Sequence, residues 1–136
     1  MIRGSCLCGG VQFEARNVQR ALEFCHCSRC RKVTGSAFAA GVLVAPEDFT
    51  LLQGHELVHV YAAPVREAAP AYHSCFCSRC GSRVPDAFSC APLVELPAGC
   101  LDNDYGLRPA MHIHVEGKAP WFTISDGLPQ HQGNTL

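Results

Sequence analysis

The sequence has little of what marks a membrane protein, a secreted protein or a nucleic-acid-binding protein. Its apolar runs fall far short of the ~20 residues needed to cross a bilayer. Lysine and arginine total 11 against 12 aspartates and glutamates, a net charge of −1, whereas a nucleic-acid-binding domain normally carries a basic patch. The first ten residues, MIRGSCLCGG, lack the apolar segment of a secretory signal. We therefore expect a cytoplasmic protein that binds neither membranes nor nucleic acids.

Helical periodicity is also scarce, and short turns near 28–33 and 46–49 are its best candidates. Alternation of apolar and polar residues instead predicts short strands separated by proline and glycine. The expected strands cover 9–15, 38–46, 56–63, 111–117 and 121–125. Residues 62–73 are expected to form a hairpin tip, and 128–136 a loose tail. This pattern predicts an all-β, antiparallel fold, with one domain over 1–136 because no linker divides the chain.

Ten cysteines dominate the composition. Such a density indicates either a disulfide scaffold or bound metal. The cysteines cluster as C-x-C and C-x2-C, and thiols so close together in one segment are poor disulfide partners. The chain is also long enough to fold without many cross-links. We therefore expect bound zinc in a reducing compartment.

The C-x-C spacings predict which sulfurs share an ion. Residues i and i+2 of a strand point to the same side of a sheet. Cys6 can therefore share an ion with Cys8, and Cys25 with Cys27.

Two similar hexapeptides, CHCSRC (25–30) and CFCSRC (75–80), also contain C-x2-C turns. The turn from Cys77 to Cys80 is followed by a glycine, which permits the left-handed backbone that tightens a zinc knuckle. The turn at Cys30 is followed by arginine instead, which is less typical of a closed knuckle. The similarity indicates a shared metal-binding geometry, with an ancient internal duplication as the alternative.

These spacings predict two Zn²⁺ ions per chain, held in different ways. A structural zinc is closed by four protein ligands, and a catalytic zinc keeps one position open. The closed set is Cys6, Cys8, Cys77 and Cys80, and the open set is Cys25, Cys27 and Cys30. The first C-x-C pair could instead join Cys27 and Cys30, and Cys75 could replace Cys77. Two structural zincs without any chemistry is a further alternative.

Several stretches of the chain match a known pattern in the same order. They are GSCLCGGVQFE (4–14), CHCSRCRKVTGSAF (25–38), CSRCGS (77–82), PAGCLD (97–102) and HIHVEGKAPWF with the later DGLP (112–129). Together they resemble the family of glutathione-dependent formaldehyde-activating enzymes, which shares its domain with centromere protein V. The resemblance extends along nearly the whole chain.

The resemblance implies an all-β zinc fold described as a β-tent. It implies a structural zinc on Cys6, Cys8, Cys77 and Cys80, and a second, labile zinc on the catalytic Cys25, Cys27 and Cys30. It also implies a carbon–sulfur lyase, in which the thiol of glutathione adds to formaldehyde to give S-hydroxymethylglutathione. Glutathione and a small aldehyde are then the partners. Relatives often carry an arginine three residues before the knuckle, where this chain has Ser74.

A zinc ion held by three thiolates would be a weak Lewis acid, because the site carries a net negative charge. Such a site suits exchange of thiolate ligands better than activation of water, and we expect it to hold its metal weakly.

Candidates for binding the substrate are Arg29, Arg31, Lys32, Thr34 and Gly35. The three cations can meet the carboxylates of glutathione, or they can form a solvated basic turn. The alternative for the whole protein is a non-enzymatic zinc-binding module that carries a thiol adduct or docks a protein partner.

Other residues are expected to have structural roles. His26 should point away from the metal, because it lies between two ligand cysteines on an extended segment. His112 and His114 share a strand face and are expected to pack or face solvent, with metal binding as the alternative. Trp121 is expected in the core or at its rim. Three further cysteines are expected to be small buried hydrophobes, namely Cys75, Cys90 and Cys100.

Overall fold

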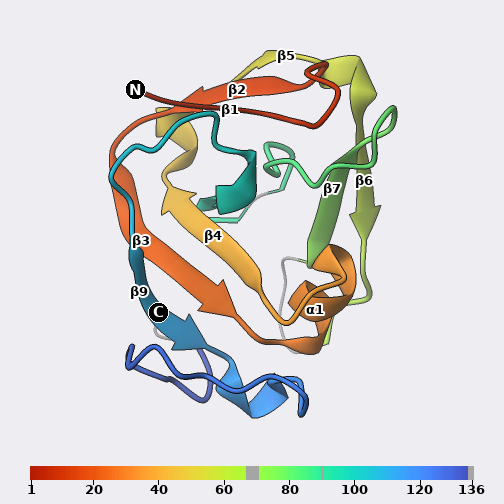
Figure 1. The fold of residues 1–136 in the computed structure, drawn as a ribbon. Helices are drawn as coiled ribbons and strands as arrows, with labels where there is room; N and C mark the ends of the chain where they lie inside the picture. The colour runs from red at the N-terminus through yellow and green to blue at the C-terminus, as the bar shows by residue number, and fades with distance from the viewer. Residues whose placement is uncertain (67–70, 90, 135–136) are drawn as a thin grey trace.

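The computed structural model describes residues 1–66, 71–89 and 91–134 (Figure 1). Within these residues the chain forms short strands, one short α-helix and several 3₁₀ turns. The strands are β1 (Ile2–Ser5), β2 (Gln12–Ala15), β3 (Val18–Cys25), β4 (Ala39–Val44), β5 (Phe49–Gln53), β6 (Val58–Ala62), β7 (His73–Cys77), β8 (Val94–Pro97) and β9 (Pro109–Ile113). The helix is α1 (Ser28–Thr34), and the 3₁₀ turns are η1 (Pro46–Asp48), η2 (His55–Leu57), η3 (Ala98–Cys100) and η4 (Val115–Gly117).

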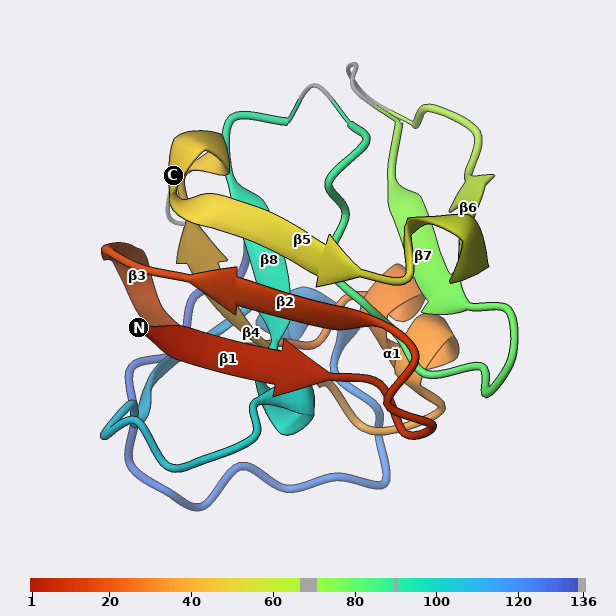
Figure 2. The same ribbon diagram turned by 90° about the horizontal axis from the view of Figure 1, so that it is seen from above.

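The strands form two sheets and a separate hairpin. The first sheet has the order β1-β2-β5, and the second has the order β8-β4-β3-β9. Strands β6 and β7 pair only with each other among the described strands. Figure 2 shows the first sheet lying across β4 and β8, with the β6–β7 hairpin to one side. The predicted all-β class is confirmed, and the pairing is antiparallel for each described strand pair except β3–β9, which is parallel.

The main core lies between the two sheets because each presents an apolar face to the other. Phe13 and Ala15 alternate with polar residues along β2, and both are almost completely buried. Val42, Val44 and Leu96 meet them from β4 and β8. Alternation along a strand leaves the other face of the second sheet free of this core.

Four of the five expected strands overlap observed strands, namely β2, β4, β6 and β9. The expected strand at 121–125 is wrong, because this segment forms a turn and irregular structure. Its backbone is bonded locally instead: Lys118 Nζ donates to the carbonyl of Phe122 at 2.6 Å, and the Phe122 N–H donates to the carbonyl of Ala119 at 3.1 Å. Trp121 is 72% exposed, so it lies on the surface instead of in the core.

Both short helical turns expected from the sequence are present, as α1 and η1. The hairpin expected around 62–73 is formed by β6 and β7, and residues 67–70 of its tip lie outside the described residues. In the part of the chain that the structure describes, no helix is long and apolar enough to cross a membrane.

The C-terminal tail is not loose over its described residues. The His112 N–H donates to the carbonyl of Pro129, and the His131 N–H donates to the carbonyl of His112, both at 2.9 Å. The tail therefore runs along β9 as an added partner of that strand, which the expectation of a free end missed.

Gly54 closes the turn between β5 and η2 and has a φ of +91°. A Cβ atom at this position would lie 2.4 Å from the carbonyl oxygen of Gly10 and 2.8 Å from the Cα of Val11. Both obstacles are backbone atoms, so we expect Gly54→Ala to lower the free energy of unfolding by about 2–4 kcal/mol. Chemical denaturation would measure it. Gly99→Ala is the control, because no neighbouring atom lies within 4 Å of its Cβ; equal losses in the two variants would contradict the prediction.

Candidate functional site

Four cysteines from distant parts of the chain meet just beyond β1 and at the end of β7. The Sγ atoms of Cys6, Cys8, Cys77 and Cys80 lie within 4.8 Å of one another. The sulfur of Cys8 lies 3.6 Å from that of Cys6 and 3.8 Å from that of Cys77. Four sulfurs bound tetrahedrally at ~2.3 Å to one zinc would be about 3.8 Å apart. The geometry of this four-cysteine cluster therefore fits a closed zinc site.

Backbone donors point at two sulfurs of the four-cysteine cluster. The Val11 N–H donates to Cys6 Sγ at 3.2 Å, and the Gly10 N–H donates to Cys8 Sγ at 3.4 Å. Hydrogen bonds of this kind stabilise the thiolate form that a metal binds. Val11 is also fully buried beside the cluster, so one short loop provides both donors and an apolar wall.

The C-x2-C turn closes as its sequence indicates. Gly81 has a φ of +77°, and its N–H donates to the carbonyl of Cys77 at 2.7 Å. Ser82 lies just beyond, with its Oγ 3.3 Å from Cys80 Sγ. Hydrogen bonding from the Ser82 side chain and then from its backbone lowers the pKa of Cys80 to about 5, which favours the thiolate at neutral pH.

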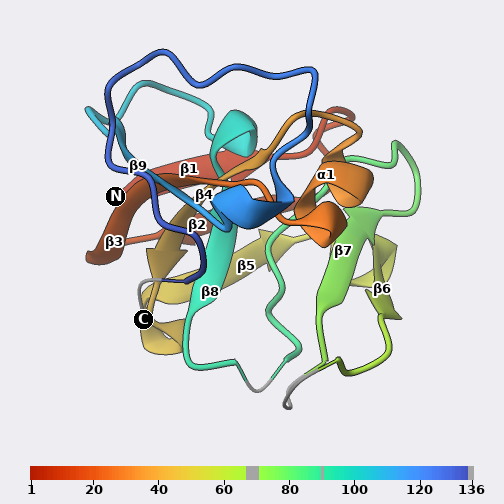
Figure 3. The same ribbon diagram turned by 90° about the horizontal axis from the view of Figure 1, so that it is seen from below.

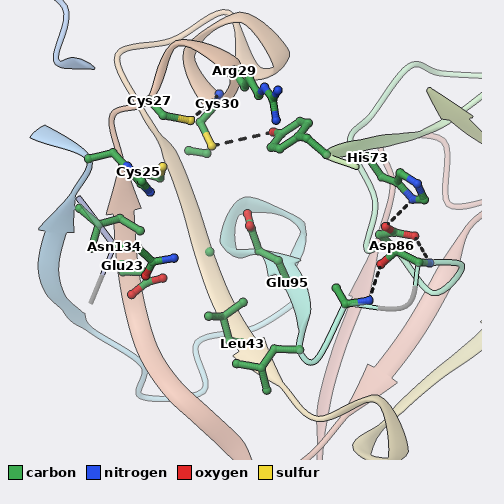
Figure 4. Close-up of a pocket in the computed structure, with 18 of the residues that line it drawn as sticks. Glu23, Cys25, Cys27, Arg29, Cys30, Leu43, His73, Asp86, Glu95 and Asn134 are labelled. Atoms are coloured by element: carbon green, nitrogen blue, oxygen red, sulfur yellow. Dashed lines mark hydrogen bonds and ion pairs between the residues drawn. The ribbon is translucent and has the colours of Figure 1, made fainter. Parts of the chain in front are cut away.

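A second cluster gathers Cys25, Cys27 and Cys30, whose sulfur atoms also lie within 4.8 Å of one another. Cys25 ends β3, Cys27 caps the N-terminus of α1, and Cys30 lies inside that helix (Figure 4). The Cys30 N–H donates to Cys27 Sγ at 3.3 Å, so the helix cap and the cluster depend on the same sulfur. Among the described residues, no fourth His, Cys, Asp or Glu joins this three-cysteine cluster.

The three sulfurs share protons unequally when no metal neutralises them. Hydrogen bonds from Cys25 and then from Cys30 hold the pKa of Cys27 well below its usual range. The same contacts, with burial added, raise the pKa of Cys25. These shifts favour the thiolate at Cys27 over that at Cys25, and a metal ion that bound all three sulfurs would displace the protons that remain.

The alternative pairings left open by the sequence are not found among the described residues. Cys6 and Cys8 do not approach the cysteines of α1. Cys75 does not replace Cys77, because its sulfur lies with His73 and Asp86. Cys75 is buried as expected, Cys100 is half-buried, and Cys90 lies outside the described residues.

The three-cysteine cluster opens into a cavity of about 780 Å³. Its floor is the face of the second sheet that points away from the core, because alternate residues of each strand line it. These floor residues are Glu23 and Cys25 of β3, Ala39, Gly41 and Leu43 of β4, and Glu95 of β8. The β6–β7 hairpin and the segment after β7 form the facing wall, and Figure 3 shows α1 lying beside β7.

Tyr72 and Arg29 stand where the three-cysteine cluster meets the cavity. Tyr72 Oη lies 3.8 Å from Cys30 Sγ, and the Arg29 guanidinium lies 5.4 Å from the centre of the tyrosine ring. Arg29 also donates to the carbonyl of Pro64 at 3.0 Å. Burial, followed by the charge of Cys30, raises the pKa of Tyr72, so its hydroxyl stays protonated and remains a hydrogen-bond donor.

Charged groups on the cavity floor are paired. Glu23 is 8% exposed and lies 3.0 Å from Arg20, while Glu95 lies 2.9 Å from Arg83. Burial raises the pKa of Glu23, although the charge of Arg20 acts against it. The cavity therefore offers both signs of charge to a zwitterionic ligand.

Of the five residues expected to bind the substrate, the structure brings only Arg29 to the cavity lining. Arg31 faces the other way, and its Nε donates to the carbonyl of Gly117 at 3.0 Å. Thr34 Oγ1 bonds back to the carbonyl of Cys30 at 2.8 Å. The remaining two, Lys32 and Gly35, are exposed, and Gly35 has a structural role as the left-handed cap of α1. A single short helix cannot turn all five residues towards one side.

A histidine chain lies behind the three-cysteine cluster. His26 points away from the cavity, is fully buried, and its Nε2 lies 2.7 Å from His112 Nδ1. His112 Nε2 in turn lies 2.8 Å from Asp126 Oδ2. His114 does not join them, because its φ of +52° begins η4 and its Nδ1 contacts Glu116 at 3.2 Å.

Sequence reasoning missed most of the far wall of the cavity. Tyr72, Arg83 and Asp86 had no motif to mark them. Glu23 and His73 did carry a signal, since each lies two residues before a cysteine and shares its strand face.

Comparison with known proteins agrees with this geometry. The family model described as glutathione-dependent formaldehyde-activating enzyme matches residues 1–117. A crystal structure of a Rhodobacter sphaeroides protein, a structural-genomics target, aligns with a TM-score of 0.59 at 23% sequence identity. The alignment covers 79% of this chain and 97% of that one, and it shows a shared fold. Because the family match spans most of the chain and includes both cysteine clusters, the chain belongs to the glutathione-dependent formaldehyde-activating enzyme family.

Proposed function

We propose that this protein is a zinc-dependent carbon–sulfur lyase that adds the thiol of glutathione to formaldehyde or a related small aldehyde. The observation that carries the proposal is the three-cysteine cluster at the wall of the cavity, which no fourth protein donor joins among the described residues. A zinc ion held there by Cys25, Cys27 and Cys30 would have an open position and would lower the pKa of a substrate thiol. Family membership supports the same class of reaction.

The side chains around the cluster supply the other requirements of such an addition. A carbon–sulfur bond forms between the substrate sulfur and the carbonyl carbon, and the carbonyl oxygen gains negative charge until it takes a proton. Tyr72 Oη, 3.8 Å from Cys30 Sγ, is placed to donate a hydrogen bond to that oxygen. Arg29 packs over the tyrosine ring beside this hydroxyl.

Charges on the cavity walls suit a peptide-like thiol with carboxylates and an ammonium group. Arg29 and Arg66 line the cavity, and a guanidinium matches a carboxylate in geometry. Glu23 and Glu95 on the floor are each paired with an arginine, and the ammonium group would share these carboxylates.

The cavity still has positively charged side chains although this chain has Ser74 where relatives often have arginine. Ser74 lies between His73 and Cys75 on β7, and both of those neighbours line the cavity. Alternation along the strand therefore turns Ser74 to the opposite face. The cations of the site come from α1, the hairpin and the segment after β7 instead.

The proposal is tested by exchange NMR with formaldehyde and glutathione. We expect the zinc-loaded protein to raise the rate of exchange between free formaldehyde and its glutathione adduct at least about tenfold over buffer, which corresponds to a barrier lower by about 1.4 kcal/mol. Protein from which a mild chelator has removed the labile metal is the control, and it should lose this acceleration. Binding of the adduct without any acceleration would instead favour the non-enzymatic, thiol-carrying module.

A further inference from the structure

A third group of metal-binding side chains, distinct from both cysteine clusters, lies in the wall of the same cavity. We propose that His73, Cys75 and Asp86 form a separate site for a divalent transition-metal ion of the zinc type, with an open coordination position facing the cavity. Their donor atoms lie within 4.8 Å of one another. All three residues line the cavity, and Figure 4 shows His73 and Asp86 on the side opposite Cys25.

The fold brings these three residues together through strand alternation and one backbone hydrogen bond. His73 and Cys75 are two residues apart on β7, so they share one face of the hairpin. The Val84 N–H donates to the carbonyl of Cys75 at 2.9 Å, and this bond returns the chain to β7 just before Asp86. The resulting group is mostly buried: Cys75 is 2% exposed, and the side chains of His73 and Asp86 are 18% and 20% exposed.

The facing atoms of Asp86 and His73 are only partly satisfied by contacts within the protein. Asp86 Oδ1 accepts the N–H groups of Phe88 and Ser89 at 2.9 and 3.1 Å, which fixes the carboxylate and leaves Oδ2 directed at His73. His73 Nδ1 lies 2.8 Å from that oxygen, which is an ion-pair distance, but the contact is not aligned as a hydrogen bond. A buried ring nitrogen normally makes an aligned hydrogen bond, and a metal ion that took both atoms as adjacent ligands would satisfy the nitrogen and the carboxylate together.

The chemistry of the donors selects the kind of ion. One imidazole nitrogen, one sulfur and one carboxylate oxygen are ligands of zinc and of similar borderline metals, whereas magnesium and calcium prefer oxygen alone. One thiolate and one carboxylate would balance the charge of a divalent ion. The site would therefore be a stronger Lewis acid than the three-cysteine cluster, with its net negative charge. This proposal concerns metal binding and does not depend on the lyase activity proposed above.

Equilibrium dialysis of the purified full-length chain against buffered free Zn²⁺, with metal counted by mass spectrometry, tests the site. We expect His73→Gln and Asp86→Asn each to bind one equivalent fewer at saturation than the unchanged protein, which should bind three. Asp86→Asn keeps an oxygen for the N–H groups of Phe88 and Ser89, so the turn should survive. The matched control is His59→Gln, because His59 is an exposed histidine on β6 that does not line the cavity, and it should lose no metal.

The same experiment separates this site from the three-cysteine cluster. Cys27→Ser should remove a different equivalent, so the double variant with His73→Gln should lose two. Cobalt(II) substitution adds a second readout, because Cys75→Ser should remove one sulfur-to-metal charge-transfer contribution. Equal metal content in the unchanged protein, His73→Gln and Asp86→Asn would overturn the proposed third site, whatever the result for Cys27→Ser.

Discussion

Replacing Cys80 with serine is expected to leave most of the chain unfolded at room temperature. Cys80 is one of four sulfurs that join the end of β1 to the end of β7. Metal binding at structural zinc sites contributes ~10–16 kcal/mol to folding, and a typical domain is stable by only about 5–15 kcal/mol. Losing one of four ligands would therefore consume much of the stability. Circular dichroism and metal analysis of the purified variant would measure the effect.

The matched control for Cys80→Ser is Cys100→Ser. Cys100 is half-buried, lies outside all three groups of possible ligands, and its Sγ donates to the carbonyl of Arg83 at 3.1 Å. A serine hydroxyl can replace that donor, so we expect a change of at most about 1–2 kcal/mol in the free energy of unfolding. A folded, zinc-containing Cys80→Ser protein with the stability of the control would refute the structural role assigned to the four-cysteine cluster.

Replacing Cys27 with serine is expected to have the opposite pattern, a lost metal in an intact fold. Serine is a preferred N-cap residue, so it can accept the Cys30 N–H that now bonds to Cys27 Sγ, and α1 should remain. The three-cysteine cluster would keep only two sulfurs and one weak oxygen ligand. We expect the variant to retain the circular dichroism spectrum of the unchanged protein, to bind one zinc fewer, and to lose the acceleration of exchange over buffer, because the catalytic metal site is disrupted.

An unfolded Cys27→Ser protein would mean that the three-cysteine cluster has a structural role as well. A variant that keeps its metal and its exchange rate would show that the chemistry does not depend on this cluster. Metal analysis and exchange NMR on one preparation distinguish these results. Cys100→Ser again serves as the control, since it changes a cysteine without touching either cluster.

The two cysteine clusters could be predicted from the sequence because their parts are local. C-x-C on an extended segment and C-x2-C in a turn fix which sulfurs lie close together, whatever the rest of the fold does. The prediction that Cys6 and Cys8 share an ion with a knuckle about seventy residues away depends on the need for four ligands, because spacing does not require it. The structure does bring those four sulfurs together.

The strands that sequence reasoning missed depend on partners that a local pattern does not reveal. The sequence of β3, VQRALEFC, contains several good helix formers, and irregularities in its pairing with β4 interrupt the alternation. It is a strand because β4 and β9 pair with it on both sides. Residues 121–125 show the reverse case: the alternation is there, but in the described structure no neighbouring strand pairs with them.

The cavity was out of reach for the same reason. Its floor comes from strands far apart in the sequence. Its facing wall comes from the β6–β7 hairpin, and the alternation of 56–63 predicts a strand but not where that strand lies relative to the floor. Proximity in sequence to the cysteines predicted the cavity lining correctly only for Arg29. The other expected substrate contacts lie on faces of α1, or at its end, that do not line the cavity.

The parallel pairing of β3 with β9 has a consequence for the order in which the protein is assembled. Cys25 pairs with Ile113, whereas the ligands of the four-cysteine cluster are all present once residue 80 has been made. Because a chain emerges from the ribosome N-terminus first, a metal ion bound by that cluster could be captured before the last strand has emerged. We expect this ion to join the segment after β1 to β7 early in cotranslational folding. The cavity beside the three-cysteine cluster should form last.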